Sequence, residues 1–392
     1  MSQNTTQDAA ATDQLPLATQ VSGRTSNGDF ILSVLAKRTY RWVDGHWYVD
    51  EEQEPLCGEA LANADHPALM ERDSDLHPHK EKTDVIVKGH AYGDGRTAFL
   101  AGVDVDAHRM MIHVSGDRMA DRTTTNRLQF SPPQPVEKVP LCFSHAYGGV
   151  DTLSEAKYGN PFLELADQYR GQEIDLEAAS PFRYPRNAGG MGYLMELDPA
   201  TFQPIPLPNL EAPSQLLTPE TLTYGDIDQW PRMPLPAATD WVDYGMFPRN
   251  ALMGFVPWFD PEIASVIEIE ANYVPAEIWH EDFRGNPSTF IAGLNGAPLP
   301  LQLPHLTGGE QVALRNIHPS LHQWGFTLPD EVPTLRTDGR QGKLNDTQAV
   351  IHTIVIYPDT GRMTILWRGS AKALRPYLPE ELERMPFEAI WN

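Results

Sequence analysis

Proline is the feature that most constrains what this chain can fold into. The sequence contains 35 prolines among 392 residues, well above the usual share of about 5%. Proline interrupts helix interiors and central strands because it lacks a backbone N–H and holds φ fixed. Several prolines also gather at 204–208 and 231–236. The sequence therefore predicts many turns, strand edges and extended connections, with few and short helices.

An aromatic hairpin is the clearest local prediction. An apolar run at residues 30–36 leads into Trp42, and Trp47 stands at the matching place beyond Asp44-Gly45. A two-residue type I′ turn needs positive φ at both central positions, and Asp-Gly supplies residues that tolerate it. We therefore expect a tight antiparallel hairpin centred on Asp44-Gly45.

A second hairpin is expected near the C-terminus. Residues 350–357 and 363–367 are apolar and flank Pro358-Asp-Thr-Gly361, which suits a type I turn closed by a left-handed glycine. Because both strands are apolar on both faces, this hairpin should be central in a sheet. Residues 378–384 predict one short helix. Other strands are expected at 83–92, 99–105 and 110–114, as an antiparallel meander, and at 263–273, 277–279, 289–291 and 311–316.

These patterns predict a mainly β fold of antiparallel, sandwich-like sheets. Residues 1–25 are expected to be a disordered tail, and 26–370 a single compact unit. Within that unit, 148–253 has weak periodicity and is expected to be a long irregular segment held by its aromatic residues. Residues 371–392 would contribute the short helix and a tail.

The two cysteines, Cys57 and Cys142, do not make a disulfide framework, which favours a reducing compartment. The N-terminal residues lack the basic start and apolar core of a signal peptide. No stretch approaches the roughly 18 apolar residues that a membrane span requires. We therefore expect a cytoplasmic protein.

Charge narrows the classes of partner. Thirty basic and 53 acidic residues give a net charge of −23, which opposes binding to phosphate backbones and to anionic membranes. Such a surface serves solubility and could also steer the protein toward a basic partner. Glu268 and Glu270, two apart on a predicted strand, would share one face in an acid-rich stretch. The simpler interpretation is a solvated outer face, and the alternative, for which they are our candidates, is an acidic contact surface for a basic partner.

Motifs that carry chemistry are missing from the sequence. It contains no G-x-S-x-G, H-E-x-x-H, complete phosphate loop or G-x-G-x-x-G. His77-Pro-His79 lacks a third metal ligand with suitable spacing. Cys142 and His145 lie close in sequence, but Cys142 belongs to an apolar run and is expected to be a structural thiol. We expect no catalytic residue, metal or cofactor.

Several short motifs, taken in order, resemble one bacterial family, the domain of unknown function twenty-one sixty-nine. They are Lys82-Thr-Asp-Val-Ile-Val-Lys-Gly-His-Ala-Tyr92, Phe130-Ser-Pro-Pro133 with Pro140-Leu141, Ala146-Tyr-Gly-Gly149, Asn160-Pro161, Leu207-Pro-Asn-Leu-Glu211, Tyr224-Gly225 with Trp230-Pro-Arg232, and Ile365-Leu-Trp-Arg-Gly369. The resemblance points to fixed family positions that should be mostly structural: Lys82, Asp84, Tyr147, Gly148, Asn160, Asn209, Glu211, Trp367 and Arg368. Among them, Lys82 could pair with Asp84, and Asn209 suits a cap.

The resemblance implies an adaptor or chaperone that loads a toxic effector onto the spike of a type VI secretion system. Its partners would be the effector and spike components. Aromatic anchors such as Trp230, Trp241 and Tyr244 would hold the partner, while Glu268 and Glu270 set orientation and on-rate. Two alternatives stay open. One is a carbohydrate hydrolase on a β scaffold, which would need a carboxylate pair with split pKa values, and the other is a structural component of the spike.

Overall fold

The computed structural model describes residues 17–125, 127–159, 182–194, 202–222, 233–252, 291–339 and 342–391. Strands dominate these residues, and the helices among them are three short α-helices and two 3-10 turns. Nearly all strand pairs are antiparallel, which confirms the predicted mainly β class. The strands expected at 263–273 and 277–279 lie outside the described residues, as do Trp230, Asn160, Glu268 and Glu270.

The larger sheet is built around the predicted C-terminal hairpin. Its order is β1-β2-β23-β22-β6-β17, with β3 added to β2, and only β6 and β22 pair in parallel. Gly361 has φ 61° in the hairpin turn, and both strands are buried almost throughout, so this hairpin is central as predicted. The strands are β1 (Ala18–Arg24), β2 (Phe30–Val43), β3 (His46–Val49), β6 (Thr83–Val87), β17 (Gln302–Leu303), β22 (Ala349–Tyr357) and β23 (Arg362–Lys372).

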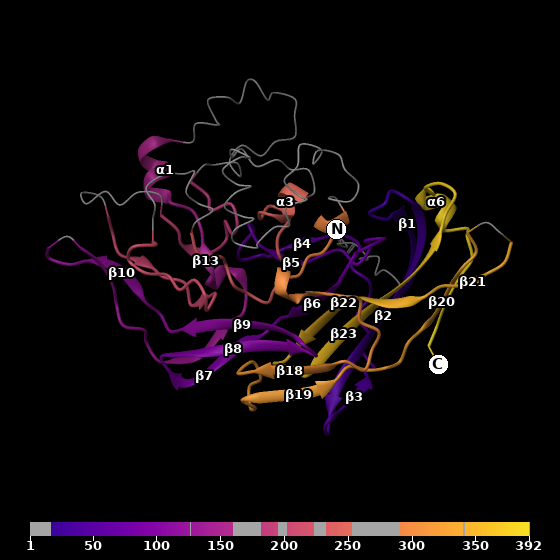
Figure 1. Ribbon diagram of the computed structural model, residues 1–392, viewed down its shortest axis with the longest axis horizontal. Helices are drawn as coiled ribbons and strands as arrows, with labels where there is room; N and C mark the ends of the chain where they lie inside the picture. Colours follow the sequence, from indigo (N-terminus) through magenta and orange to yellow (C-terminus); the bar gives the residue numbers. More distant parts are fainter. Residues whose placement is uncertain are drawn as a thin grey trace, which may run out of the picture.

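A second sheet packs against the first through a shared core. Its order is β16-β9-β8-β18-β19, and side chains along β18 and β19 alternate between buried and exposed. One apolar cluster contains Trp367 and Ile365 of the first sheet together with Val103 and Ile112 of the second. Figure 1 shows β3 lying beside β19 where the two sheets meet. The strands are β8 (Ala98–Val105), β9 (His108–Ser115), β16 (Leu210–Glu211), β18 (Gln311–Arg315) and β19 (Gln323–Thr327).

Smaller elements flank the sandwich, and a second apolar cluster around Tyr147, Tyr184 and Phe247 holds the described part of the middle segment. The remaining strands are β4 (Leu61–Ala62), β5 (Met70–Arg72), β7 (His90–Arg96), β10 (Met119–Arg122), β11 (Leu128–Phe130), β12 (Val136–Pro140), β13 (Tyr147–Gly148), β14 (Met191–Gly192), β15 (Ile205–Pro206), β20 (Thr334–Thr337), β21 (Asn345–Asp346) and β24 (Phe387–Ile390). The helices are α1 (Thr152–Tyr158), α3 (Arg249–Leu252) and α6 (Pro379–Leu382), with 3-10 turns η1 (Phe143–His145) and η6 (Leu299–Leu301).

The strand predicted at 83–92 is two strands, so the expected three-strand meander is wrong. The chain leaves the first sheet at Lys88-Gly89, where β6 ends, and β7 then pairs with β12. Only β8 and β9 of the predicted meander pair with each other. The reason lies in the burial of β6. It lies between β22 and β17 and is buried on both faces, as strands of parallel sheets are. A continuous apolar run of this kind does not indicate which strand pairs with it.

Both predicted tails contain ordered strands. Residues 18–24, assigned to the disordered tail, form β1 on the edge of the first sheet, where the Gln20 side chain donates to the carbonyls of Leu382 and Met385. At the other end, β24 pairs with β20 after the predicted short helix, α6. β1 is mostly polar and β24 has four residues, so neither shows a clear apolar alternation, and pairing with a distant strand forms both.

The aromatic hairpin β2–β3 has the predicted turn, and this makes a direct test possible. Asp44 and Gly45 have φ of 48° and 85°, as a type I′ turn requires. A side chain at Gly45 would meet no atom within 4 Å, so a substitution there acts on the backbone alone. We expect Gly45→Val to lower the free energy of unfolding by about 1–2 kcal/mol, measured by urea denaturation. Gly45→Asn is the control, because asparagine tolerates positive φ; equal losses for both variants would contradict the turn assignment.

Candidate partner-binding groove

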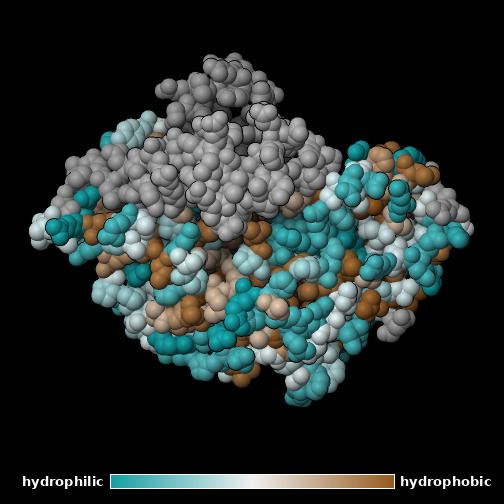
Figure 2. All heavy atoms as spheres, viewed as in Figure 1, coloured by the Kyte–Doolittle hydropathy of each residue, from teal (hydrophilic) through white to brown (hydrophobic). Residues whose placement is uncertain are grey.

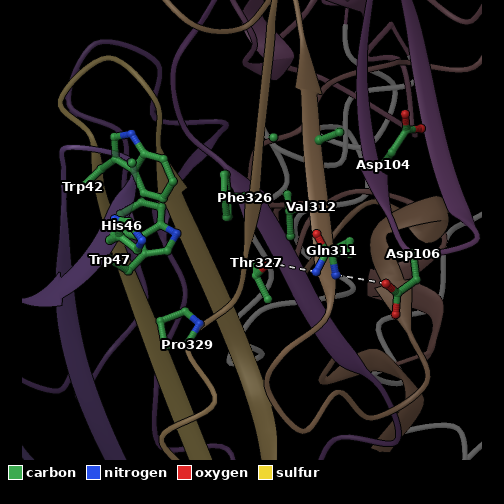
Figure 3. A pocket seen from close by; sticks show the side chains of 13 residues that line it. Trp42, His46, Trp47, Asp104, Asp106, Gln311, Val312, Phe326, Thr327 and Pro329 are labelled. Atoms are coloured by element: carbon green, nitrogen blue, oxygen red, sulfur yellow. Dashed lines mark hydrogen bonds between the residues drawn. The ribbon is translucent and has the colours of Figure 1, made fainter.

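An open groove of about 780 Å³ lies between the β2–β3 hairpin and the second sheet. Trp42 and Trp47 of the hairpin form one wall, and Asp104 and Asp106 stand at the opposite end. Figure 3 shows the aromatic side chains gathered on one side and the carboxylates on the other, with β18 and β19 between them. The groove is therefore apolar on one side and acidic on the other.

The hairpin turn positions the aromatic wall. Trp42 and Trp47 pair across β2 and β3, so both side chains project from one face, with ring centroids 5.1 Å apart. Trp47 stands edge-on to the buried Phe326, with centroids 5.1 Å apart, and Trp42 lies 5.6 Å from Trp324. Both hairpin tryptophans stay half-buried. The core thus fixes large aromatic side chains while part of their surface faces the groove.

Hydrogen bonds fix the acidic end. Arg109 Nε and Nη2 donate to the two carboxylate oxygens of Asp104, at 2.5 and 3.2 Å. The backbone N–H of Gln311 donates to Asp106 at 2.9 Å, and the Gln311 side chain donates to the Thr327 hydroxyl at 2.8 Å. These carboxylates are therefore held in place by neighbouring side-chain and backbone donors, and His46 and Thr327 are among the other polar residues of the lining.

A second cavity, of about 400 Å³, lies beneath the middle segment. Met110, Met111 and Met246 line it, with Lys82 and Arg249 among its charged residues. Its wall also includes residues on both sides of 253–290, which lies outside the described residues. We therefore assign no role to this cavity.

Comparison with known proteins identifies the family. The family model described as "uncharacterized protein conserved in bacteria (DUF2169)" matches residues 27–368. The chain belongs to the DUF2169 family. No curated protein and no solved structure shows significant similarity to it. The family match includes every residue that lines the groove and all strands of the two sheets except β1 and the last residues of β23.

The family position Asp84 is the centre of a buried network in this DUF2169 protein. Lys80 Nζ lies 2.7 Å from Asp84, and both side chains are almost fully buried. The Asp84 carboxylate also accepts from the Asn295 side chain and from the backbone N–H groups of Gly296 and Ala297. The predicted partner, Lys82, is wrong, because Lys82 points to the surface while Lys80 reaches inward from before the strand.

Arg368 occupies an unusual buried position on β23. Its guanidinium contacts the Nδ1 atom of His79 and lies 3.3 Å from Nε2 of His305, and no described carboxylate pairs with it. Burial lowers the pKa of Arg368 to about 10. Burial, followed by the charge of Arg368, lowers the pKa of His79 to about 4 and also lowers that of His305. Neutral imidazoles thus serve as acceptors for a buried cation.

The other family positions hold the backbone together, as expected of structural residues. Asn209 is not a helix cap: its side chain donates to the Ser115 carbonyl and to Asp117, joining the second sheet to the middle segment. Glu211 pairs with Arg118 at 2.6 Å and accepts from the Leu217 N–H. Trp367 is fully buried. Tyr147 lies in the second apolar cluster, and Gly148 has φ 150° where a Cβ would meet the Asn187 carbonyl at 2.1 Å.

Trp241 and Tyr244, the two predicted aromatic anchors among the described residues, do not line the groove. Trp241 is 4% exposed and belongs to the core. The Tyr244 hydroxyl donates to Asp73 at 2.5 Å, within a buried group that also includes Arg249, 2.6 Å from the same carboxylate. Their contact with a partner stays a prediction, as does that of Trp230, Glu268 and Glu270.

Cys142 lies beside Ser144 and His145, with its sulfur 3.6 Å from His145 Nδ1. Burial raises the pKa of the Cys142 thiol, which favours the unreactive protonated form. Both cysteines are free. Among the described residues, no three His, Cys, Asp or Glu side chains are grouped to hold a metal ion, and no helix is long and apolar enough to cross a membrane.

Sequence reasoning missed the groove, although it found one wall. Trp42 and Trp47 were used only to predict the hairpin. Two tryptophans beside a tight turn, where side chains are often exposed, were the signal that could have indicated a binding surface. Asp104, Asp106 and Gln311 carry no local signal, because they come from two segments about 200 residues apart, the end of β8 and the start of β18. Only the register of β8, β18 and β19 places them beside the hairpin.

Proposed function

We propose that this DUF2169 protein is a non-catalytic carrier that binds another protein in the groove, and that its client is an effector of a type VI secretion system, delivered to the secretion spike. The observation that carries the proposal is the half-exposed aromatic wall of Trp42 and Trp47. Rigid aromatic side chains set against a packed core are the usual anchors of protein interfaces. The secretion context rests on the ordered motifs described above.

Charge favours a basic client. At the far end of the groove Asp106 contributes negative charge, whereas that of Asp104 is offset by Arg109, and Asp44 lies at the hairpin tip beside the groove. The whole chain carries a net charge of −23, and on the face shown in Figure 2 hydrophilic residues prevail over scattered hydrophobic ones. Such a surface accelerates encounter with a basic protein and leaves the apolar anchors to set the dissociation rate.

Deletion of the gene tests the cellular role. We expect loss of secretion or accumulation of one cognate effector, while other effectors are still secreted. The same effector should be retained by the tagged protein at low salt, because salt screens the attraction between exposed charges. If every effector is secreted normally by the deletion strain and neither effector nor spike protein is retained, the proposal is wrong.

The hairpin offers a matched pair of variants for the groove itself. Trp47 faces the groove, whereas its neighbour Tyr48 is 57% exposed on the opposite face of the hairpin. We expect Trp47→Ala to raise the Kd for the effector roughly 30-fold or more, since a hot-spot residue contributes about 2 kcal/mol. Tyr48→Ala should leave Kd within about threefold. Both variants should be checked by thermal unfolding, and equal Kd values in folded variants would place the binding surface elsewhere.

A further inference from the structure

The strand β19 at the groove has a free edge, and its hydrogen-bond register identifies the open groups. The Asn316 N–H donates to the His322 carbonyl, and the Leu328 N–H donates to the Glu310 carbonyl. In an antiparallel pair, residues bonded to the partner strand alternate with residues whose N–H and C=O point away. Counting along the β18–β19 register, the residues with outward groups are Gln323, Gly325 and Thr327.

These outward groups have no partner among the described residues. β19 is the last strand in its sheet, and the backbone hydrogen bonds described for the chain include none from Gln323, Gly325 or Thr327 to a further strand. All three residues are exposed. Six backbone groups, three donors and three acceptors, are therefore available along one side of the groove.

The edge also lacks the usual protection against pairing. Exposed edge strands are commonly blocked by charged side chains, proline, a bulge or very short length. β19 spans five residues, Gln-Trp-Gly-Phe-Thr, with no charge and no proline, and its pairing with β18 shows no register shift. Gly325 at its centre leaves the surface flat, with only the Val312 carbonyl within 4 Å of where a Cβ would stand. The opposite edge strand, β16, has two residues.

We propose that the client inserts an extended segment along β19, extending the second sheet by one strand, and this inference rests on the proposed function. Backbone hydrogen bonds to Gln323, Gly325 and Thr327 hold the segment. Its side chains alternate between the two faces of the sheet, so every second one lies next to Trp47 and Phe326. Strand addition of this kind combines sequence-independent backbone pairing with specificity from the pockets beside it.

Charge selects a client segment over a second copy of this chain. Pairing two copies through β19 would bring together two chains that each carry a net charge of −23. Like charges opposed in this way disfavour association. Two five-residue strands alone also bury much less than the roughly 1,200 Å² of a stable interface. A client segment with apolar residues could pack against Trp42 and Trp47, and nearby Lys or Arg residues would complement the acidic side of the groove.

Removing a single backbone N–H group from the edge of β19 tests the proposal. Gly325→Pro removes one outward N–H without touching the bonds to β18, and proline is tolerated at such edge positions. Gly325→Ala adds a Cβ in ordinary contact with the Val312 carbonyl, at 3.9 Å, and keeps the N–H. The probe is a peptide selected against the wild-type protein from short random peptides displayed on phage, then synthesised. We expect Gly325→Pro to raise the Kd of this peptide at least roughly tenfold and Gly325→Ala to leave it within about twofold.

Two further measurements use only the wild-type protein, so they test the proposal even if the proline variant does not fold. They are amide hydrogen exchange and binding of backbone-methylated peptides. On binding to the wild-type protein, the amides of Gln323, Gly325 and Thr327 should exchange more slowly. Methylating alternate backbone nitrogens of the peptide should abolish binding in one register and spare it in the other. Selected peptides should combine alternating apolar residues with Lys or Arg.

The outcomes separate this inference from the proposed function. If Trp47→Ala weakens peptide or effector binding while Gly325→Pro and the three amides show no change, the groove binds protein but strand addition is wrong. If the wild-type protein is a dimer and Gly325→Pro makes it monomeric, the edge serves a second copy and the client assignment is overturned. If neither peptides nor any effector bind, both proposals fall.

Discussion

Replacing Lys80 with methionine should lower the free energy of unfolding by about 3 kcal/mol, and replacing Asp84 with leucine should lower it by about 5 kcal/mol. Both side chains are almost fully buried, and breaking such a pair leaves one charge without its partner. The losses should differ because of the remaining contacts. Without Lys80, Asp84 keeps three N–H donors from Asn295, Gly296 and Ala297. Without Asp84, the described partners left to Lys80 are the Thr353 hydroxyl, at 3.3 Å, and the Trp241 ring, whose centroid lies 5.7 Å away.

Lys82→Met is the matched control, because Lys82 is two residues away and exposed. Its loss should change the free energy of unfolding by less than about 0.5 kcal/mol. Urea denaturation of the three variants measures all of these differences. Equal losses for Lys80→Met and Lys82→Met would show that the ion pair contributes nothing beyond its surroundings, and a larger loss for Lys80→Met than for Asp84→Leu would contradict the role given to the loop amides.

The hairpins could be predicted because their information is local. Asp44-Gly45 and Pro358–Gly361 specify turns within four residues, and apolar runs on both sides specify the strands. The ion pair could not be predicted in the same way. Asp84 sits two residues from Lys82 and four from Lys80, and sequence spacing favours neither. The choice depends on Asn295 and its neighbours, which are 211 positions away and close over Asp84.

The break between β6 and β7 illustrates a second limit. The apolar pattern of residues 83–92 continues through Lys88-Gly89, yet the chain changes sheets there. The Lys88 N–H donates to the Ile356 carbonyl, and Pro358 lies 3.1 Å from where a Cβ of Gly89 would stand. Both contacts come from the distant C-terminal hairpin. The groove shares this property, because its acidic end and its aromatic wall meet only through the register of the second sheet.

A polar layer covers the outer face of the larger sheet, and it brings buried histidines together. Residues 50–82 lie over this face, where the Ser33 hydroxyl donates to the Pro78 carbonyl and His352 Nε2 donates to the His77 carbonyl at 3.1 Å. Lys37 pairs there with Glu54 and Asp75. Histidines that stay neutral serve this layer as acceptors and donors without adding a further charge. The arrangement makes the fold dependent on pH.

Mild acid should therefore destabilise the protein strongly. Burial lowers the pKa of four histidines in this layer: His77, His79, His305 and, well below its ordinary value, His352. As the pH falls below the ordinary value of about 6.5, the unfolded chain takes up protons that the folded protein does not. The stability that the neutral histidines contribute is therefore fully present above about pH 6.5. It decreases as the pH falls toward 4, the pKa of His79. Each extra proton on the unfolded chain contributes about 1.4 kcal/mol per pH unit.

Two described carboxyl groups, Asp240 and Asp243, act in the opposite direction, because burial raises the pKa of each. Burial raises the pKa of Asp240 to about 6, so the folded protein binds its proton first and gains stability as the pH falls. The two carboxyl groups offset part of the effect of the four histidines, and the remainder determines the net loss. Urea denaturation between about pH 7 and pH 4.5 should show a continuous decrease in the free energy of unfolding.

Replacing one buried histidine should reduce the slope of the free energy of unfolding against pH by the contribution of about one proton. His352 is fully buried, so His352→Gln should remove about one proton from the uptake on unfolding, or about 1.4 kcal/mol per pH unit near pH 5.5. His108→Gln is the control, because His108 is exposed beside the β8–β9 turn and is surrounded by solvent in both states. The control should keep the wild-type slope. If the His352→Gln curve runs parallel to the wild type across this range, buried histidines are not the source of the acid sensitivity.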